Sequence, residues 1–457
     1  MKINAFLIAF IFGLFTSNLS AEETLIQGKI DGFEGATIRV GFYEDYISFK
    51  KKFIASSQIE DGQFQLKIEV DEVTHLILMV EDKQTSLFAE AGQVYNLFLS
   101  YSIENNSRRA FEKFLDLRFT FPRENELNQK IKVFNSDYQD FFSTHYERFI
   151  VNEADQEVAA FIKDQTEKSV YQSPPYLKNY VKYALANLED INRGDQNDLE
   201  TKYLKQQTVL IKHKEYMNFF RQLYKEDFEQ LLIRKSAKPL MEALMMDEDL
   251  NKSIQLIKSL KGFQNDALAE LYLINGLFEV YHTKRINQKS NLKLLAALTA
   301  NGSSEAIQKQ AGMVLAQLKR MTESADAPAF SLKNTKGEVV DLAALKGKPV
   351  YLGFWANWSL ISLKELRLMQ ALKEKYANSV HFISINIDED ASLNAKVKQD
   401  YGYDWPFLYG GKDYLLREQY EVRTVPLYYL IDKNGKLVQR YAPPPHQVEN
   451  KLSSLID

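Results

Sequence analysis

Two serines at the start of a predicted helix are the residues whose spacing comes closest to reactive chemistry. The segment GFWANWSLISLKEL, residues 353–366, runs from an apolar strand into a helix and places Ser359 and Ser362 at the junction, with two residues between them. The first turn of a helix offers unpaired N–H groups and a partial positive charge, which stabilise an anionic nucleophile. A serine hydroxyl is too weak an acid for a helix terminus alone to ionise.

A serine nucleophile would also need a base within hydrogen-bond reach and a group that orients the base. The histidines of this region are His381, at the edge of a predicted strand, and His446, near the C-terminus, and nothing in the sequence brings either one to Ser359. The pattern Ser362-Leu-Lys-Glu365 matches a capping box, in which a hydroxyl and a carboxylate bind the first N–H groups of a helix. We therefore predict that the serines cap the helix and that the chain has no catalytic residue.

Three weaker motifs lack essential parts. The segment that begins at Asp388, DEDASLNAKVKQD, has neither the turn glycine nor the final glutamate of a calcium loop. Gly410-Gly411-Lys412 has no upstream glycine and no following serine or threonine, so it does not form a phosphate loop. The six histidines show no metal-ligand spacing. We expect no metal, no nucleotide and no other cofactor.

The composition argues against nucleic-acid binding and excludes cysteine chemistry. The formal net charge is −4, from 57 Lys+Arg and 61 Asp+Glu, and no long basic stretch interrupts the sequence, so nucleic acid is not an expected partner. The chain contains no cysteine. It can therefore form no disulfide and offer no thiolate. This excludes thiol–disulfide exchange by this polypeptide alone.

The N-terminus has the features of a cleaved secretory signal. Lys2 is followed by an apolar stretch over residues 5–15 and by small residues that end at Ala21, before an acidic pair. This stretch is shorter than the roughly 20 apolar residues of a membrane span, and without cysteine no lipid can be attached to a thiol at the cleavage site. We expect a signal peptide over residues 1–21 and a periplasmic protein of a Gram-negative bacterium, without a membrane anchor.

The periodicity of apolar residues divides the rest of the chain into three parts. The length of 457 residues is too great for one compact core. The segment FQLKIEV, residues 64–70, alternates as half-buried strands do, whereas YVKYALANLEDI, residues 180–191, repeats at three and four as helices do. We predict a small antiparallel β domain of sandwich type, an irregular all-α region and a C-terminal α/β domain. The boundaries are signal peptide 1–21, β domain 22–103, helical region 104–322 and α/β domain 323–457.

The last part reads as an α/β layer. A strand pair surrounds residues 335–337, a one-turn helix follows, and the buried strand 350–354 leads into the serine-containing helix. A strand, a further helix, a hairpin of two strands and a last helix complete the pattern.

Residues 325–457 resemble the thioredoxin superfamily, specifically its exported TlpA-like and AhpC-TSA (redoxin) branch. The resemblance rests on ordered motifs that cover about 130 residues: Ala-Pro-Ala-Phe at 327–330, Gly-Lys-Pro at 347–349, Phe-Trp-Ala-Asn-Trp at 354–358, Thr-Val-Pro at 424–426 and Ile-Asp-Lys-Asn-Gly at 431–435. The β segment resembles, more weakly, the N-terminal domain that often precedes this module in secreted bacterial proteins.

The resemblance implies where the family's reactive site would lie. Family members carry Cys-x-x-Cys at the helix start, so Ser359 and Ser362 are vestigial redox positions. It also implies a cis peptide bond before Pro426 and a shallow apolar groove formed by four residues. They are Trp355, Trp358, Val425 and Pro426.

Two functions remain open from the sequence. The first is a redox-inactive thioredoxin-fold protein that binds a protein or peptide ligand, with the β and helical parts as a platform. The second is a component of a thiol-disulfide oxidoreductase system that acts with a cysteine-bearing partner, or an enzyme with non-thiol chemistry at an unrecognised site.

Overall fold

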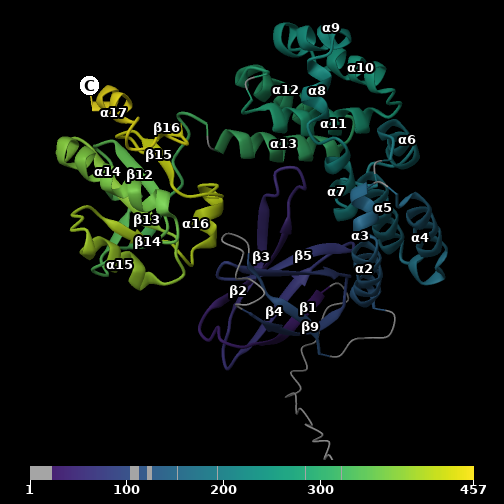
Figure 1. Ribbon diagram of the computed structural model, residues 1–457, viewed down its shortest axis with the longest axis horizontal. Coiled ribbons are helices and arrows are strands. Elements are labelled where there is room, and N and C mark those ends of the chain that lie inside the picture. Colours follow the sequence, from purple (N-terminus) through teal and green to yellow (C-terminus); the bar gives the residue numbers. More distant parts are fainter. Residues whose placement is uncertain are drawn as a thin grey trace, which may run out of the picture.

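The computed structural model describes residues 23–102, 113–120, 126–151, 153–192, 194–283, 285–320 and 322–456. These residues form an N-terminal β domain, a central helical region and a C-terminal α/β domain (Figure 1), which confirms the predicted multidomain fold. The predicted signal peptide lies outside the described residues. No helix in the described part of the chain combines the length and the hydropathy that a bilayer crossing requires.

The β domain contains two sheets, with strand orders β4-β1-β7-β9 and β3-β2-β5-β6-β8. Most neighbouring strands are antiparallel, but β1 pairs with β7 in parallel and β6 with β8 in parallel. The strands are β1 (Glu23–Ile30), β2 (Thr37–Tyr43), β3 (Lys51–Gln58), β4 (Gln63–Glu69), β5 (Thr74–Val80), β6 (Lys83–Ala89), β7 (Val94–Ser100), β8 (Lys113–Phe114) and β9 (Asp116–Phe119).

The predicted alternation appears directly in β4, where every second side chain is buried. Ile26 and Leu97 from one sheet pack with Val40 and Leu78 from the other in a single apolar core. The two sheets pack face to face around this core and form a sandwich, and β5 is also buried on its other face.

The central region is an irregular set of helices. They are α2 (Leu127–Thr144), α3 (Tyr146–Val151), α4 (Asp155–Glu167), α5 (Pro175–Ile191), α6 (Gln196–Glu200), α7 (Lys214–Leu223), α8 (Asp227–Leu232), α9 (Lys238–Glu242), α10 (Leu250–Lys261), α11 (Asp266–Val280), α12 (Gln288–Asn301) and α13 (Glu305–Arg320). Short 3-10 turns lie at Ser169–Tyr171 and Lys235–Ala237, and π-helical turns at Thr201–Lys205 and Ala243–Asp247. Helix α11 is buried along most of its length, which explains its nearly continuous apolar sequence.

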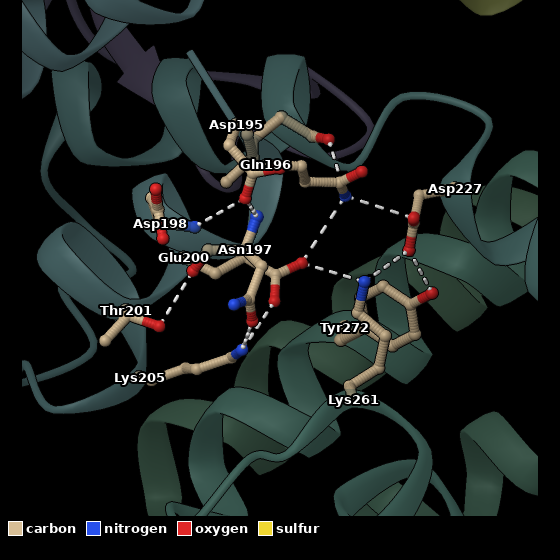
Figure 2. Close-up of polar contacts among 11 residues, drawn as sticks. Asp195, Gln196, Asn197, Asp198, Glu200, Thr201, Lys205, Asp227, Lys261 and Tyr272 are labelled. Atoms are coloured by element: carbon tan, nitrogen blue, oxygen red, sulfur yellow. Dashed lines mark hydrogen bonds and ion pairs between the residues drawn. The ribbon is translucent and has the colours of Figure 1, made fainter.

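A buried ionic network joins four helical segments of this region (Figure 2). Lys261 of α10 contacts Glu200 at 2.8 Å and Asp227 at 3.1 Å, and Lys205 contacts Glu200 at 3.0 Å. The hydroxyl of Tyr272 in α11 donates to Asp227 at 2.6 Å. Two carboxylates and two ammonium groups thus balance one another where water is largely excluded, which fixes the packing of these helices.

The C-terminal domain is built on a five-stranded sheet with strand order β14-β13-β12-β15-β16. Strands β12, β13 and β14 are parallel, whereas β15 is antiparallel to β12 and to β16. The elements are β10 (Ser331–Lys333), β11 (Val339–Asp341), the 3-10 turn Leu342–Leu345, β12 (Val350–Trp355), α14 (Leu360–Tyr376), β13 (His381–Asn386), α15 (Ala391–Asp400), β14 (Phe407–Tyr409), α16 (Tyr414–Gln419), β15 (Leu427–Ile431), β16 (Leu437–Arg440) and α17 (Glu449–Ile456).

Strand β12 lies at the centre of the sheet, and all six of its residues are buried. Leu352 and Phe354 belong to the core on one face, while Tyr351 and Trp355 belong to the core on the other. Burial on both faces explains why this strand is a continuous apolar run rather than an alternating one.

Two elements of this domain are absent from the sequence-based prediction. Strand β14 has three residues and helix α16 has six. These segments are too short to show the alternation of a strand or the three-to-four-residue repeat of a helix in the sequence. Strand β14 extends the sheet, and α16 contributes Tyr414, Arg417 and Glu418 to contacts with the other two parts of the chain.

The C-terminal domain is joined to the β domain through a buried cluster of charges. Asp82, which follows β5, is 3% exposed and contacts Lys83 at 2.8 Å, Lys113 at 3.1 Å and Arg417 of α16 at 3.1 Å. Nearby, Lys412 pairs with Glu81 at 2.9 Å. The two domains therefore share one ionic interface that excludes water around Asp82.

Candidate functional site

Ser359 caps the N-terminus of α14. Its backbone is extended, with φ −96° and ψ 102°, and its Oγ accepts the N–H of Ser362 at 3.2 Å. The capping-box prediction, which placed Ser362 in the cap, is wrong, because the chain enters helical geometry three residues earlier, directly after Ser359. Glu365 does not close a capping box and lies beside Tyr428.

Ser362 faces the interior of the domain. Its side chain is fully buried, and its Oγ has no hydrogen-bond partner among the described residues. Both vestigial redox positions are therefore buried: Ser362 is closed to solvent, and Ser359 is 9% exposed.

The structure separates Ser359 from both histidines of its domain. His381 pairs with Val350 at the start of β12, whereas Ser359 follows the end of that strand. The intervening six-residue strand spans roughly 17 Å at about 3.3 Å per residue. His446 lies near the same remote end, since it is close in sequence to Pro443, whose carbonyl oxygen accepts from the Tyr351 hydroxyl. Neither imidazole can act as a base for Ser359.

The loop that contains Pro426 lies against the helix start. The Val425–Pro426 peptide bond is cis. The Oγ of Ser359 donates to the Val425 carbonyl oxygen at 3.4 Å, which brings together two segments that are far apart in the sequence. Val425 itself is mostly buried, while Thr424 and Arg423 before it are exposed.

The predicted four-residue groove needs corrections at Val425 and Trp355. Val425 is 8% exposed, so its side chain does not form an open surface. The side chain of Trp355 is 2% exposed and packs edge-on against Phe407 in the core, at a ring-centroid distance of 5.6 Å, because it is the last residue of the doubly buried β12. It supports the surface from below and does not line it.

An exposed apolar rim surrounds Ser359. Trp358 is 52% exposed, Leu360 is 74% exposed and Ile361 is 61% exposed. We call these three residues, together with the half-buried Pro426, the apolar rim. Leu360 and Ile361 were not predicted as site residues, although their place between the two serines, in the first turn of the helix, was a signal that could have identified them.

Asp388 anchors the turn that leads to the rim. Its Oδ2 accepts the backbone N–H of Asn357 at 2.7 Å and the side-chain amide of Asn386 at 2.6 Å. Burial raises the pKa of this carboxyl, and the two hydrogen bonds oppose the rise. Among the described residues, no three His, Cys, Asp or Glu side chains gather as metal ligands, here or elsewhere.

Comparison with known proteins places the same region in a family. The model of the AhpC/TSA family matches residues 324–440. The thiol-disulfide oxidoreductase ResA of Bacillus subtilis is 31% identical over 127 residues, which cover 28% of this chain and 70% of ResA. The thioredoxin-like protein YneN of the same organism is 31% identical over 116 residues, which cover 25% of this chain and 67% of YneN.

Solved structures match about a third of the chain. The thioredoxin domain of a thiol-disulfide oxidoreductase from Bacteroides vulgatus has 23% sequence identity and a TM-score of 0.27, and the match covers 30% of this chain and 99% of that domain. A thiol:disulfide interchange protein from a Bacteroides species has 20% identity and a TM-score of 0.28, over 30% of this chain and 91% of the other.

Proposed function

This chain belongs to the AhpC/TSA family of thioredoxin-like proteins, and from that premise we propose that it is a cysteine-free member that binds a protein or peptide through the apolar rim. The proposal rests on two features of one helix start. Serines occupy both redox positions, and the exposed apolar rim surrounds Ser359. Because both positions are serine, this helix start carries no thiol. Binding of a ligand by the apolar rim explains why an exposed apolar surface is present there without thiol chemistry.

The energetics of the rim favour a bound partner. Three large apolar side chains lie within four consecutive residues, and each is more than half exposed. Complete burial of a fully exposed large apolar side chain contributes about 1.5–3 kcal/mol. These three are 52–74% exposed, so a ligand that covers them gains a correspondingly smaller share of that energy from each. A single exposed apolar residue needs no explanation, but a contiguous group of them is typical of interaction sites.

The chemistry expected of the ligand is that of an extended segment with apolar side chains. In the loop beside the rim, Arg423 and Thr424 are exposed, whereas Val425 is buried. An extended peptide can form backbone hydrogen bonds with this loop while its side chains contact the apolar rim.

A second candidate function rests on the relatives. ResA, which is 31% identical, is named a thiol-disulfide oxidoreductase. On this alternative the chain belongs to a thiol-disulfide system and acts with a partner that supplies the cysteines, for example by holding a cysteine-containing substrate on the rim.

The proposal includes export. The expected signal peptide, residues 1–21, and the absence of cysteine fit a periplasmic protein that neither forms disulfides nor exchanges them. Mass spectrometry of the protein isolated from the envelope should give a mature chain that starts at Glu22, whereas an intact N-terminus would contradict this part of the proposal.

The binding proposal is tested by affinity capture from envelope extract. The wild type is compared with the variant Leu360→Ser, Ile361→Ser and with a matched control, Ile233→Ser, Met246→Ser, whose side chains are 56% and 80% exposed in the helical region. A partner retained by the wild type and the control but lost by the rim variant supports the proposal. Equal capture by all three proteins contradicts it and assigns binding to another part of the chain. Free thiols in the captured partner would favour the second candidate function.

A further inference from the structure

A cavity of about 530 Å³ lies where the three parts of the chain meet. One wall is the connection between β2 and β3, with Phe49. The second is formed by α7, α11 and α13, and the third by α16 and β16. Figure 1 shows α13 and α16 on two sides of this junction. Its volume lies within the range of about 300–1,000 Å³ that is typical of small-molecule sites.

The lining of the cavity carries an excess of positive charge. It contains six lysine and arginine side chains and three glutamates, which leaves a difference of three positive charges. The cations are Lys50, Lys51, Arg221, Arg320, Arg423 and Arg440. The glutamates are Glu279, Glu418 and Glu421. Cations outnumber carboxylates in a partly enclosed space, where electrostatic interactions are stronger than in water.

Several of these cations already have a carboxylate partner. Arg320 and Arg440 both contact Glu421, and Arg423 contacts Glu418 at 2.6 Å. Lys50 contacts Glu44 at 2.6 Å.

Arg221 of α7 differs from them. Within the described chain it makes neither an ion pair within 4 Å nor a hydrogen bond. Its guanidinium carbon lies 4.4 Å from the ring centroid of Phe49, and Glu279 and Asp45 act on it only as more distant charges. Arginine stays charged even when partly buried, and its planar group offers five donors in a fixed arrangement. The stacking on Phe49 holds this group in place and leaves its donors available.

We propose that this cavity binds a small organic anion, and that Arg221 pairs with its carboxylate or phosphate group. Two parallel N–H···O bonds from one guanidinium match the geometry of either group. None of the four rim residues lines the cavity, although Arg423 belongs both to its lining and to the loop beside the rim. The bound anion contacts all three parts of the chain at once. It therefore also stabilises their arrangement, because a ligand that binds only the folded form raises its stability by mass action.

The test is calorimetric titration of the full chain with citrate and, separately, with inorganic phosphate, at an ionic strength held constant with sodium chloride. The titrations are repeated with Arg221→Gln, with Arg221→Lys and with the control Arg234→Gln, which removes an exposed arginine outside the cavity. We expect saturable binding of at least one probe to the wild type and to the control, weakened roughly tenfold or more in Arg221→Gln, because charge-assisted hydrogen bonds are lost. Saturation by citrate alone identifies a carboxylate site, and saturation by phosphate alone identifies a phosphate site.

Arg221→Lys and one further variant, Glu279→Gln, keep the result interpretable. Arg221→Lys keeps the charge but loses the paired donors, so it should fold as the wild type does and bind with intermediate affinity. Glu279→Gln removes a carboxylate from the lining and should bind the anion more tightly. If neither probe saturates the wild type, or if Arg221→Gln and Arg221→Lys bind as tightly as the control, the proposal is overturned.

Discussion

The Oγ of Ser359 accepts the N–H of Ser362 at 3.2 Å, so one of the two serines caps the helix by bonding to the backbone of the other. The hydroxyl of Ser362, by contrast, is buried and has no partner in the described chain. The two hydroxyls of the Ser-x-x-Ser pattern therefore differ in their hydrogen bonding: one caps the helix and the other is buried without a partner.

The first prediction concerns these two hydroxyls. Ser359→Ala should lower the free energy of unfolding by about 1 kcal/mol, because the cap hydrogen bond is lost. Ser362→Ala should be neutral or stabilising, because it removes a buried polar group that lacks a partner. Urea denaturation of both variants measures the difference, and an equal loss in the two would contradict the assigned cap.

The second prediction concerns the missing sulfur. The double variant Ser359→Cys, Ser362→Cys should reduce insulin disulfides when supplied with a thiol reductant, because the helix terminus stabilises a thiolate at the first position. The single variant Ser359→Cys is the control and should show little turnover, because no second thiol resolves the mixed disulfide. Inactivity of the folded double variant would show that the surface has diverged in more than its sulfur atoms.

The third prediction is a pH dependence of the interface between the β domain and the C-terminal domain. Burial by itself raises the pKa of Asp82, but Lys83, Lys113 and Arg417 outweigh it and lower the pKa from 3.8 to about 2. A carboxyl whose pKa is lower in the folded state contributes stability above its unfolded pKa and loses that contribution as pH falls through its folded pKa. The contribution of Asp82 should therefore be complete at pH 7 and should disappear between about pH 4 and pH 2.

Denaturation of the wild type and Asp82→Asn at several pH values measures this contribution. The variant should be clearly less stable at neutral pH, since three cations lose their buried partner, and the difference should shrink as the pH approaches 2. A difference that stays constant over this range would contradict the assigned ion cluster.

The fourth prediction compares a buried and an exposed lysine. Lys261→Met removes the cation that joins Glu200 and Asp227 (Figure 2) and should cost about 3–5 kcal/mol, because two buried carboxylates lose a partner. Lys252→Met breaks the exposed pair with Asp247 and should cost no more than about 1 kcal/mol. Thermal unfolding of the two variants compares the costs directly, and similar values would argue against an ionic role for the network.

The sequence was sufficient to predict those features that depend on local periodicity. The alternation in β4 and the continuous apolar run of β12 identified the β sandwich and the central strand of the α/β sheet, and the ordered motifs identified the family of the C-terminal domain. The short elements β14 and α16 were missed because three and six residues do not complete a recognisable period.

Features that depend on contacts between distant segments could not be predicted. The burial of Trp355 follows from Phe407 packing against it, and the charge cluster at Asp82 follows from the approach of Arg417 from another domain. The same holds for Arg221, whose lack of a partner becomes visible only when the three parts of the chain are placed around the cavity. The rim residues Leu360 and Ile361 are an intermediate case, since their position in the helix was predictable but their exposure was not.

Site-specific photo-cross-linking tests the central claim most directly. A photoreactive side chain is placed at Leu360 in one protein and, as a control, at Ile233 in another, and both are irradiated in envelope extract. The account predicts a discrete cross-linked partner from position 360, whose yield falls when an unlabelled wild-type competitor is added, and no such product from position 233. The same products from both positions, or none from position 360 in the folded protein, would contradict the claim that the former redox surface is a binding site.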